Sequence, residues 1–558
     1  MQGDHCSRSP VALGNSASFT GLFSSESGDM MASEDSDDAK PWTPRDGETG
    51  FPGLFRSFSR EQVEPLQANI KGKVPEWVDG SLLRNGPGKF DVGPDTYEHW
   101  FDGLAVLLRY NIHKGMVTYQ SRFLRSDSYI KAMEQNRIVM SEFGTVAQPD
   151  PCQSYLGRFL SRFVPRTFTD NCNINWAQYG DEFYAVTDGT LMRKVNPNSL
   201  ETLHKVDISD RIAVHSTSSH PHTAKDGTVY GLGSRFSYRS SYNIIKIPPH
   251  DQDVKGDPLS NASILCSIPA SGTYPTFYHS FAMTDNYFVF VEQSAVINLL
   301  KVLYAQLFFK SYIIGMEFHD ERPTRFHVVK RYSGELLPQI YTSIPFLSFH
   351  HINAYEEAGH LVIDMCIYED GSILRDINLK DLRNGVKPAQ FGKAKRFVLP
   401  VGETIEDYRG GSRPNWLEIF KADVTLKEDG SVYCVPQVIA DRNVEFPRMN
   451  YELYNGKPYR FFYANGGELN QKLLKVDTKS VTSEEWFEDG CFPSEPIFVR
   501  SPDCKSEDDG VVLSSVVDLR KGKHSFLLVL DARDFTEVAR AEVEAEVSFG
   551  YHGMFLHK

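Results

Sequence analysis

The chain has 558 residues, of which 41% are hydrophobic and 12% aromatic, so it can bury a large core. Its formal net charge of −14 argues against a nucleic-acid-binding protein, which usually shows a basic surface, and against broad electrostatic docking on anionic lipid. The eight cysteines are scattered and form no CxxC pair, which is typical of free thiols in a reducing compartment.

The first 54 residues are rich in Ser, Asp, Gly and Pro, as in SSESGDMMASEDSDDAKPWTPRDGETG. This composition predicts a disordered, acidic tail, and it contains no secretory signal pattern. A mitochondrial transit peptide would be rich in Arg and poor in acids, whereas the first ~25 residues carry only Arg8. We therefore expect a cytoplasmic protein, with a mitochondrial location as the alternative.

From about residue 55 to the end, short runs rich in β-branched and aromatic residues alternate with turn residues. Hairpin turns are indicated by Asp188-Gly189, Asp226-Gly227, Asp429-Gly430 and Asn455-Gly456. No linker interrupts the pattern, so we expect residues 55–558 to form one all-β domain. At this size a β-propeller protects its strand edges better than an open sandwich does. A row of separate β-sandwiches is the alternative.

Two segments depart from the strand pattern. Residues 149–168 place Leu and Phe at helical spacing between arginines, which predicts a short basic amphipathic helix. Residues 294–316 are strongly apolar, but Asn298 and Lys301 interrupt them, which disfavours a membrane-spanning helix. Both segments are interpreted as helices that cap the core. Alternatively, they form an apolar patch that dips into one leaflet of a membrane or admits a hydrophobic substrate.

Four histidines share one context, because each lies near a strand or hairpin end beside small or aromatic residues. They are His220, His279, His350 and His552. Any one of them taken alone is more often a hydrogen-bonded core residue than a ligand. In a propeller, however, strand starts from different blades converge on one axis, so distant histidines can meet there. Four neutral imidazoles without a thiolate or carboxylate ligand would suit Fe(II) with open coordination positions.

Three acidic residues have similarly apolar or turn-flanked neighbours, namely Asp188, Glu445 and Glu495. A metal-bound histidine normally donates its second ring N–H to a carboxylate or carbonyl group, which fixes its tautomer. A glutamate between apolar neighbours is costly to bury without a partner. These acids are therefore candidates for holding the histidines, and the alternative is that each is a surface acid at a strand end.

These stretches together resemble the carotenoid cleavage oxygenase family, and its animal branch in particular, over about residues 55–558. The strings that carry the resemblance are GSLLRNGPGKF, EHWFDGLA, SEFGTVAQPDPC, HPHTAKDGTVY, YHSFAMTDNYFVFVEQ, FHHINAYEE, EFPRMNY, PSEPIFV, EDDGVVLS and YHGMF. The resemblance implies an all-β, seven-bladed β-propeller with one Fe(2+) ion on its axis and a helical, apolar cap over one face.

The resemblance also assigns roles to the histidines and acids. It makes His220, His279, His350 and His552 the iron ligands, rather than the neighbouring His222 and His351. It makes Asp188, Glu445 and Glu495 the acids that hold three of the ligands, and it requires no catalytic side chain beyond the iron centre. Cys152 matches a family cysteine, which is either a free thiol or a site of lipidation.

One position departs from the family pattern. The animal relatives usually have Thr-Glu-Thr-Asn or Ser-Glu-Thr-Asn where this chain has Thr187-Asp188-Gly189-Thr190. Aspartate is one methylene shorter than glutamate. We therefore expect the hydrogen bond from Asp188 to its histidine to be longer than usual or to pass through water.

The resemblance implies an Fe(II) dioxygenase that uses O2 to cleave a C=C bond of a carotenoid or apocarotenoid into two carbonyl products. The stretch from Phe168 to Asp207 is similar to the central-cleaving 15,15′ enzymes, whereas the ending just after HGMF is similar to the eccentric 9′,10′ enzymes. We expect central cleavage of β-carotene to retinal and peripheral contact with membranes. The alternatives are eccentric cleavage to apo-10′-carotenal and an ionone, a retinyl ester isomerohydrolase, and a non-catalytic carotenoid-binding protein.

Overall fold

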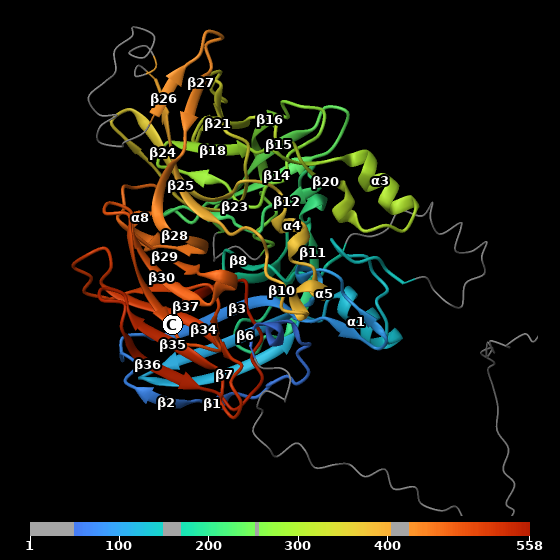
Figure 1. The fold of residues 1–558 in the computed structure, drawn as a ribbon, viewed down its shortest axis with the longest axis vertical. Helices are drawn as coiled ribbons and strands as arrows, with labels where there is room; N and C mark the ends of the chain where they lie inside the picture. Colours follow the sequence, from blue (N-terminus) through green and yellow to red (C-terminus); the bar gives the residue numbers. More distant parts are fainter. Residues whose placement is uncertain (1–49, 149–168, 251–255, 403–404, 406–422) are drawn as a thin grey trace, which may run out of the picture.

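The computed structural model describes residues 50–148, 169–250, 256–402, 405 and 423–558 (Figure 1). Nearly all of the predicted acidic tail lies outside these residues, as do the predicted basic helix at 149–168 and Cys152. The first element among the described residues is the 3-10 helix η2 (Phe51–Phe55), which buries four of its five residues. Beyond it the described chain consists mostly of short strands, so the all-β prediction is confirmed.

The described residues form six larger sheets, whose strands are named below in spatial order. The first contains β1 (Leu66–Gln67), β7 (Met116–Phe123), β6 (Leu104–His113), β3 (Gly80–Lys89) and β37 (His552–His557). The second contains β11 (Thr202–Asp207), β10 (Leu191–Val195), β9 (Glu182–Val186) and β8 (Asn175–Tyr179). The third contains β12 (Ser216–Thr217) and β13 (His222–Thr223), both paired with β14 (Val229–Arg235), then β15 (Ser241–Ile247) and β16 (Ser263–Pro269).

The fourth sheet contains β17 (Ala282–Met283), β18 (Tyr287–Glu292), β21 (Thr324–Lys330), β22 (Tyr341–Ser343), β27 (Val432–Val435) and β26 (Asp423–Leu426). The fifth contains β23 (Leu347–Glu357), β24 (His360–Tyr368), β25 (Lys393–Pro400), β28 (Gln437–Arg448), β29 (Phe461–Gly466), β30 (Lys472–Asp477) and β31 (Thr482–Phe487). The sixth contains β2 (Asn69–Gly72), β36 (Glu537–Glu542), β35 (Phe526–Asp531), β34 (Gly510–Asp518), β32 (Cys491–Pro493) and β33 (Ile497–Arg500). Two short pairs complete the strands, namely β4 (Asp91–Val92) with β5 (Asp95–Thr96) and β19 (Ala295–Ile297) with β20 (Met316–Phe318).

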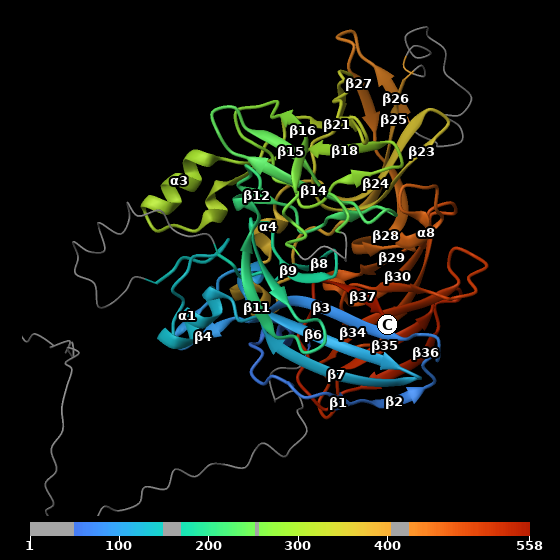
Figure 2. The same ribbon diagram turned by 180° about the vertical axis from the view of Figure 1, so that it is seen from behind.

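The two ends of the described chain exchange strands. The last strand, β37, pairs antiparallel with β3 of the first sheet, and the early strand β2 pairs with β36 of the sixth sheet. Figures 1 and 2 show β37 beside β3 from opposite sides of the molecule. This exchange closes the arrangement of sheets and places the start of β37 in the middle of the fold.

Three of the four predicted turn pairs are confirmed as hairpin connections. Asp188-Gly189 joins β9 to β10, Asp226-Gly227 joins β13 to β14, and Asp429-Gly430 joins β26 to β27. The fourth prediction is wrong, because Asn455-Gly456 follows the short helix α8 (Tyr451–Tyr454). Gly456 has a φ of +79°, a conformation that commonly ends helices as well as forming turns, so the dipeptide alone does not distinguish the two cases.

The helices among the described residues are short. They are α1 (Asp127–Gln135), α3 (Leu299–Leu307), α4 (Ile373–Asp376), α5 (Leu379–Arg383) and α8, with 3-10 helices η3 (Trp100–Asp102), η5 (Ile208–Asp210), η6 (Tyr312–Gly315) and η7 (Glu468–Asn470). Helices α1 and α3 project on one side of the strands in both views (Figures 1 and 2). No helix among the described residues is long and apolar enough to cross a membrane.

The apolar segment 294–316 is only partly helical. It begins with β19, continues into α3 and η6, and ends at the first residue of β20. The side chain of Asn298, one of the residues that interrupt the apolar run, accepts a hydrogen bond from the backbone N–H of Lys301 and thereby starts the helix. The pairing of β19 with β20 joins the two ends of the segment to each other.

The largest hydrophobic cluster joins the first and sixth sheets to the short helix α5. It includes Leu82 on β3, Leu108 on β6, Leu513 on β34 and Leu379 on α5, all at most 1% exposed. Smaller clusters fill the other sheets and their contacts. The six cysteines among the described residues, Cys172, Cys266, Cys366, Cys434, Cys491 and Cys504, are all free, as predicted.

Candidate metal centre

The structure brings the four singled-out histidines together at the centre of the sheets. The ligand atoms of His220, His279, His350 and His552 all lie within 4.8 Å of one another. His220 lies in the loop between β12 and β13, and His279 lies just before β17. His350 lies on β23, and His552 is the first residue of β37. The neighbours His222 and His351 lie outside this group.

Each of the three predicted acids contacts a different histidine of the group. The Nδ1 atom of His279 lies 2.6 Å from Oδ2 of Asp188. The Nδ1 atom of His350 lies 2.5 Å from Oε2 of Glu445, and that of His552 lies 2.8 Å from Oε1 of Glu495. Because an ionised carboxylate only accepts hydrogen bonds, these contacts place the ring proton on Nδ1 and leave a lone pair on each Nε2.

The Nε2 atoms face one another at short distances. His350 Nε2 lies 3.2 Å from His552 Nε2, and His220 Nε2 lies 2.8 Å from His279 Nε2. Burial lowers the pKa of His552 to about 3, and it also lowers the pKa of His220, with the neighbouring histidines adding to the effect. The contacts with Glu445 and Glu495 place a lone pair on Nε2 of both His350 and His552, and these lone pairs repel at 3.2 Å unless a cation lies between them. The donor set therefore fits a metal ion that accepts imidazole ligands.

His220 differs from the other three members of the group. Among the residues that the structure describes, no carboxylate contacts its ring, and its only ring hydrogen-bond contact is the one with His279. It is also the one member that is partly exposed, whereas the other three are buried. Its ring is therefore the least constrained of the four.

The shorter side chain of Asp188 contacts its histidine directly, which differs from the longer or water-mediated bond expected from the sequence. The β9–β10 hairpin brings the carboxylate close enough to His279 for the 2.6 Å contact. Its other oxygen, Oδ1, accepts hydrogen bonds from the backbone N–H and the hydroxyl of Ser219 at 2.9 and 2.8 Å. Because Ser219 precedes His220, Asp188 links the loops that carry two of the four histidines.

Glu495 is held by two arginines that the sequence analysis did not identify. Arg84, which is fully buried on β3, donates to Oε2 at 3.0 Å, and Arg448 donates to Oε1 at 2.7 Å. Burial alone would raise the pKa of Glu495, but the charges of Arg448 and Arg84 and the hydrogen bond from His552 outweigh it and hold the pKa well below the usual range. The carboxylate therefore stays ionised and able to accept the N–H of His552.

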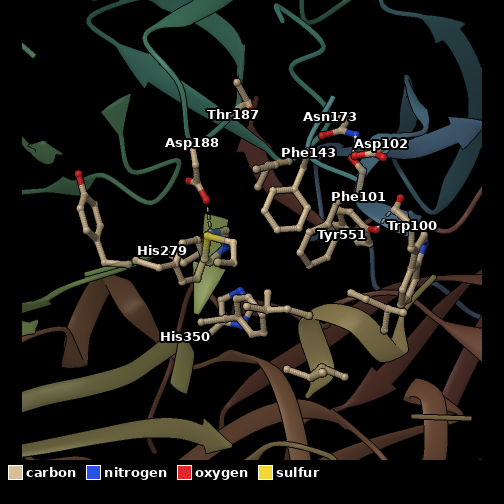
Figure 3. A pocket seen from close by; sticks show the side chains of 18 of the residues that line it. Trp100, Phe101, Asp102, Phe143, Asn173, Thr187, Asp188, His279, His350 and Tyr551 are labelled. Atoms are coloured by element: carbon tan, nitrogen blue, oxygen red, sulfur yellow. Dashed lines mark hydrogen bonds and ion pairs between the residues drawn. The ribbon is translucent and has the colours of Figure 1, made fainter. Parts of the chain in front are cut away.

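An apolar cavity of about 450 Å³ lies against the histidine group. Its lining includes His279, His350 and His552 but not His220. Figure 3 shows aromatic side chains across the cavity from His279 and His350; Trp100, Phe101, Phe143 and Tyr551 are labelled. The sequence does not show that these aromatic residues line one cavity, because they come from separate segments that only the fold brings together.

Two buried acids also line this cavity. Asp102 accepts hydrogen bonds from the backbone N–H of Gly144 and the hydroxyl of Thr145, at 3.0 and 2.6 Å. Burial raises the pKa of Asp102 to about 7, and it raises the pKa of Glu142 well above its ordinary value. Sequence reasoning missed both acids, although they lie within the quoted strings EHWFDGLA and SEFGTVAQPDPC.

Comparisons with known proteins agree with this geometry. Residues 55–557 match the family described as "Retinal pigment epithelial membrane protein". The chain is 41% identical over 517 residues to "Carotenoid-cleaving dioxygenase, mitochondrial" of Macaca fascicularis, covering 89% of this chain and 93% of the relative. It is equally 41% identical over 520 residues to "Beta,beta-carotene 15,15'-dioxygenase" of Mus musculus, covering 90% of this chain and 91% of the relative. A solved structure of a Synechocystis apocarotenoid oxygenase variant superposes with a TM-score of 0.72 at 23% identity, covering 93% of this chain and 100% of that chain, which shows the same fold.

Proposed function

Since the chain belongs to the Retinal pigment epithelial membrane protein family of carotenoid cleavage oxygenases, we propose that it is an iron-dependent dioxygenase that cleaves a C=C bond of a carotenoid with O2. The observation that carries this proposal is the meeting of four imidazoles, three of them held by carboxylates, beside an apolar cavity. A long polyene needs an apolar cavity, and oxidative cleavage needs a redox-active centre next to it.

We propose His220, His279, His350 and His552 as the ligands of one Fe(2+) ion per chain. Bound there, iron would supply a redox-active Lewis acid with coordination positions left free by the histidines. Asp188, Glu445 and Glu495 would fix the rings of three ligands so that their Nε2 lone pairs point at the metal ion. The apolar lining of the cavity would exclude water from the substrate side. The aromatic wall would fix which double bond of the polyene lies beside the ligands.

The arrangement of sheets supports a seven-bladed propeller with the iron on its axis. Six larger sheets are present among the described residues, and one of them is twice as wide as a usual blade. In that sheet the long strand β28 pairs with β25 through Gln437–Asn443 and with β29 through Val444–Arg448, so it joins two four-stranded units. We propose that residues 55–558 form this single domain, preceded by the acidic tail of residues 1–54.

Central 15,15′ cleavage of β-carotene to retinal is the reaction we propose, with O2 as co-substrate. The overall identity does not discriminate, because relatives named for central cleavage and relatives named only as carotenoid-cleaving are equally similar. The proposal rests on the similarity of the stretch from Phe168 to Asp207 to the central-cleaving enzymes. Eccentric cleavage to apo-10′-carotenal and an ionone is the second candidate.

Contact with a membrane surface would bring carotenoids to the protein. Helix α3 supports this proposal, because its apolar side chains Leu300, Leu303 and Tyr304 are 71%, 51% and 47% exposed. The location of the full chain is proposed to be the cytoplasm. The word "mitochondrial" in the name of the macaque relative supports the alternative.

One experiment separates the oxygenase from its rivals. Iron-loaded full-length protein is incubated with β-carotene, with and without O2, and the carotenoid absorbance is followed. An oxygenase bleaches the carotenoid only when O2 is present. A carotenoid-binding protein retains the colour under both conditions, and an isomerohydrolase instead converts a retinyl ester without O2.

A further inference from the structure

A second cavity lies on the other side of the histidine group. This polar chamber, of about 360 Å³, is lined by residues of all six larger sheets. Its inner end contains His220 and His350, and its outer end contains Tyr451, Glu452 and His557. The three outer residues are exposed, so the chamber connects the surface to the histidines. His220 lines this chamber and not the apolar cavity.

The two cavities differ in the kind of group that lines them. Aromatic rings form much of the apolar cavity, as described above. Apolar side chains such as Phe281 and Met283 also line the polar chamber, but imidazoles, hydroxyls and amides make up a larger share of its wall than of the apolar cavity. These polar groups include His222, His351, Ser280, Asn353 and Asn450. Moving a hydrated divalent cation past an apolar wall is costly, because its lost water contacts are not replaced. The polar groups in the wall of the chamber can replace part of those contacts as the ion advances.

Two polar pairs lie along the chamber. His222 donates from Nε2 to the carbonyl of Phe281, so its Nδ1 accepts the hydroxyl of Tyr451 at 2.8 Å. Ser280 donates its hydroxyl to the carbonyl of Phe349, so its oxygen accepts the Nδ1–H of His351 at 2.8 Å. The Nε2 atom of His351 is thereby a lone-pair donor, and it is buried without a partner among the described residues.

The charges of the chamber are paired. The guanidinium group of Arg448 donates hydrogen bonds to Glu495 and to the carbonyl of Gly553. At the mouth, Glu452 lies 3.3 Å from Arg500 and 3.5 Å from His557. Among the described residues that line the chamber, each arginine is paired with a glutamate. None of them therefore presents an unpaired positive charge that would repel an entering cation. Apart from the buried Glu495, the carboxylate in the lining of the chamber is that of Glu452, which is 54% exposed.

We propose that the polar chamber is the path by which the divalent metal ion reaches and leaves the four histidines, while the apolar cavity on the opposite side receives the polyene. This inference rests on the proposed metal centre. His220 is partly exposed to the chamber, and no carboxylate holds its ring. It is therefore the ligand that would receive the ion from the chamber. At the mouth, Tyr451 is hydrogen-bonded to His222, and this pair limits the rate of passage into the chamber.

The test measures metal exchange and needs no carotenoid. Full-length protein loaded with Fe²⁺ is placed in excess chelator without O2, and the metal that remains on the protein is measured over time. Glu452→Lys makes the mouth repel cations and is expected to slow release by about threefold at low ionic strength. Tyr451→Ala removes the ring at the mouth and is expected to speed release.

A matched control places the same charge change on the other side of the histidines. Glu317 lines a separate cavity that shares Met316 and Leu374 with the apolar cavity, and it pairs with Lys301 at 2.7 Å. Glu317→Lys is expected to leave the release rate unchanged. The path is overturned if Glu317→Lys slows release while Glu452→Lys does not, or if all variants match the wild type. A wild-type chain that retains no iron contradicts the metal centre itself, and with it the path.

Discussion

The Nδ1 atom of His552 lies 2.8 Å from Oε1 of Glu495, and both side chains are 2% exposed. His552 opens the last strand, which pairs with β3 from Gly80 to Asn85. Chain ends are usually frayed unless something ties them down. Here a strand ladder and a buried carboxylate hold the end of the chain, so the last residues form part of the candidate centre.

Removing one histidine of the group is expected to abolish metal binding and turnover together. His279→Ala and His350→Ala each remove one imidazole ligand and leave a carboxylate without its partner. Iron content after gel filtration should fall from about one per chain to near zero, and β-carotene turnover should fall with it. His351→Gln, next to His350 on β23 but outside the group, is the control and should retain the metal. Full activity in either alanine variant would contradict the four-histidine centre.

Asp188 is expected to strengthen metal binding through His279. Asp188→Ala removes the 2.6 Å contact and both bonds to Ser219, so metal affinity measured by chelator competition should fall about 10- to 100-fold. Asp188→Asn retains one carbonyl oxygen as an acceptor for the ring N–H and should lose less. Equal affinities of the wild type and the alanine variant would show that the contact does not support the ligand.

The buried pair of Arg84 and Glu495 is expected to be essential for stability. Arg84→Met leaves the buried carboxylate with Arg448 as its one arginine partner, so the free energy of unfolding should fall by about 3–5 kcal/mol. The midpoint of chemical denaturation measures this change. Lys71→Met, which removes an exposed lysine that pairs with Glu542, is the control and should change stability by less than about 1 kcal/mol. A similar small effect for Arg84→Met would contradict the role assigned to this pair.

The acid Asp102 is expected to make stability depend on pH. Burial raises its pKa from 3.8 to about 7, so between about pH 4 and pH 7 the folded state holds a proton that the unfolded state has lost. Stability contributed by this group is therefore present below pH 4 and declines as pH rises to 7, by at most ~1.4 kcal/mol per pH unit. Asp102→Asn cannot titrate, so its denaturation midpoint should lack this component. Parallel pH profiles of the two proteins would show that Asp102 does not titrate in this range.

Local patterns in the sequence predicted the all-β class and three of the four hairpin turns, whereas the residues of the candidate centre also required the family resemblance. Alternation and turn pairs gave the hairpins at Asp188-Gly189 and Asp429-Gly430, because strand and turn preferences act over a few residues. The histidines could be selected by their context and by the family strings. Their meeting point depends on how the sheets close, which no local pattern records.

Other features depend on contacts between distant segments. Arg84 and Glu495 are separated by 411 positions, and nothing around either residue indicates the other. Asn455-Gly456 was predicted as a hairpin turn, but the same dipeptide ends a helix, since a positive φ serves both purposes. The length of Asp188 predicted a weak or indirect contact with His279, whereas the position of its hairpin, which the sequence does not specify, decides the distance.

Product analysis tests the central claim most directly. Iron-loaded full-length protein is incubated in air with β-carotene, and the products are separated by chromatography. We predict retinal as the one carbonyl product, which follows from cleavage at the central double bond. A long apocarotenal with an ionone would contradict central cleavage. Unchanged, protein-bound β-carotene would contradict the proposed β-carotene oxygenase activity and favour a carotenoid-binding protein.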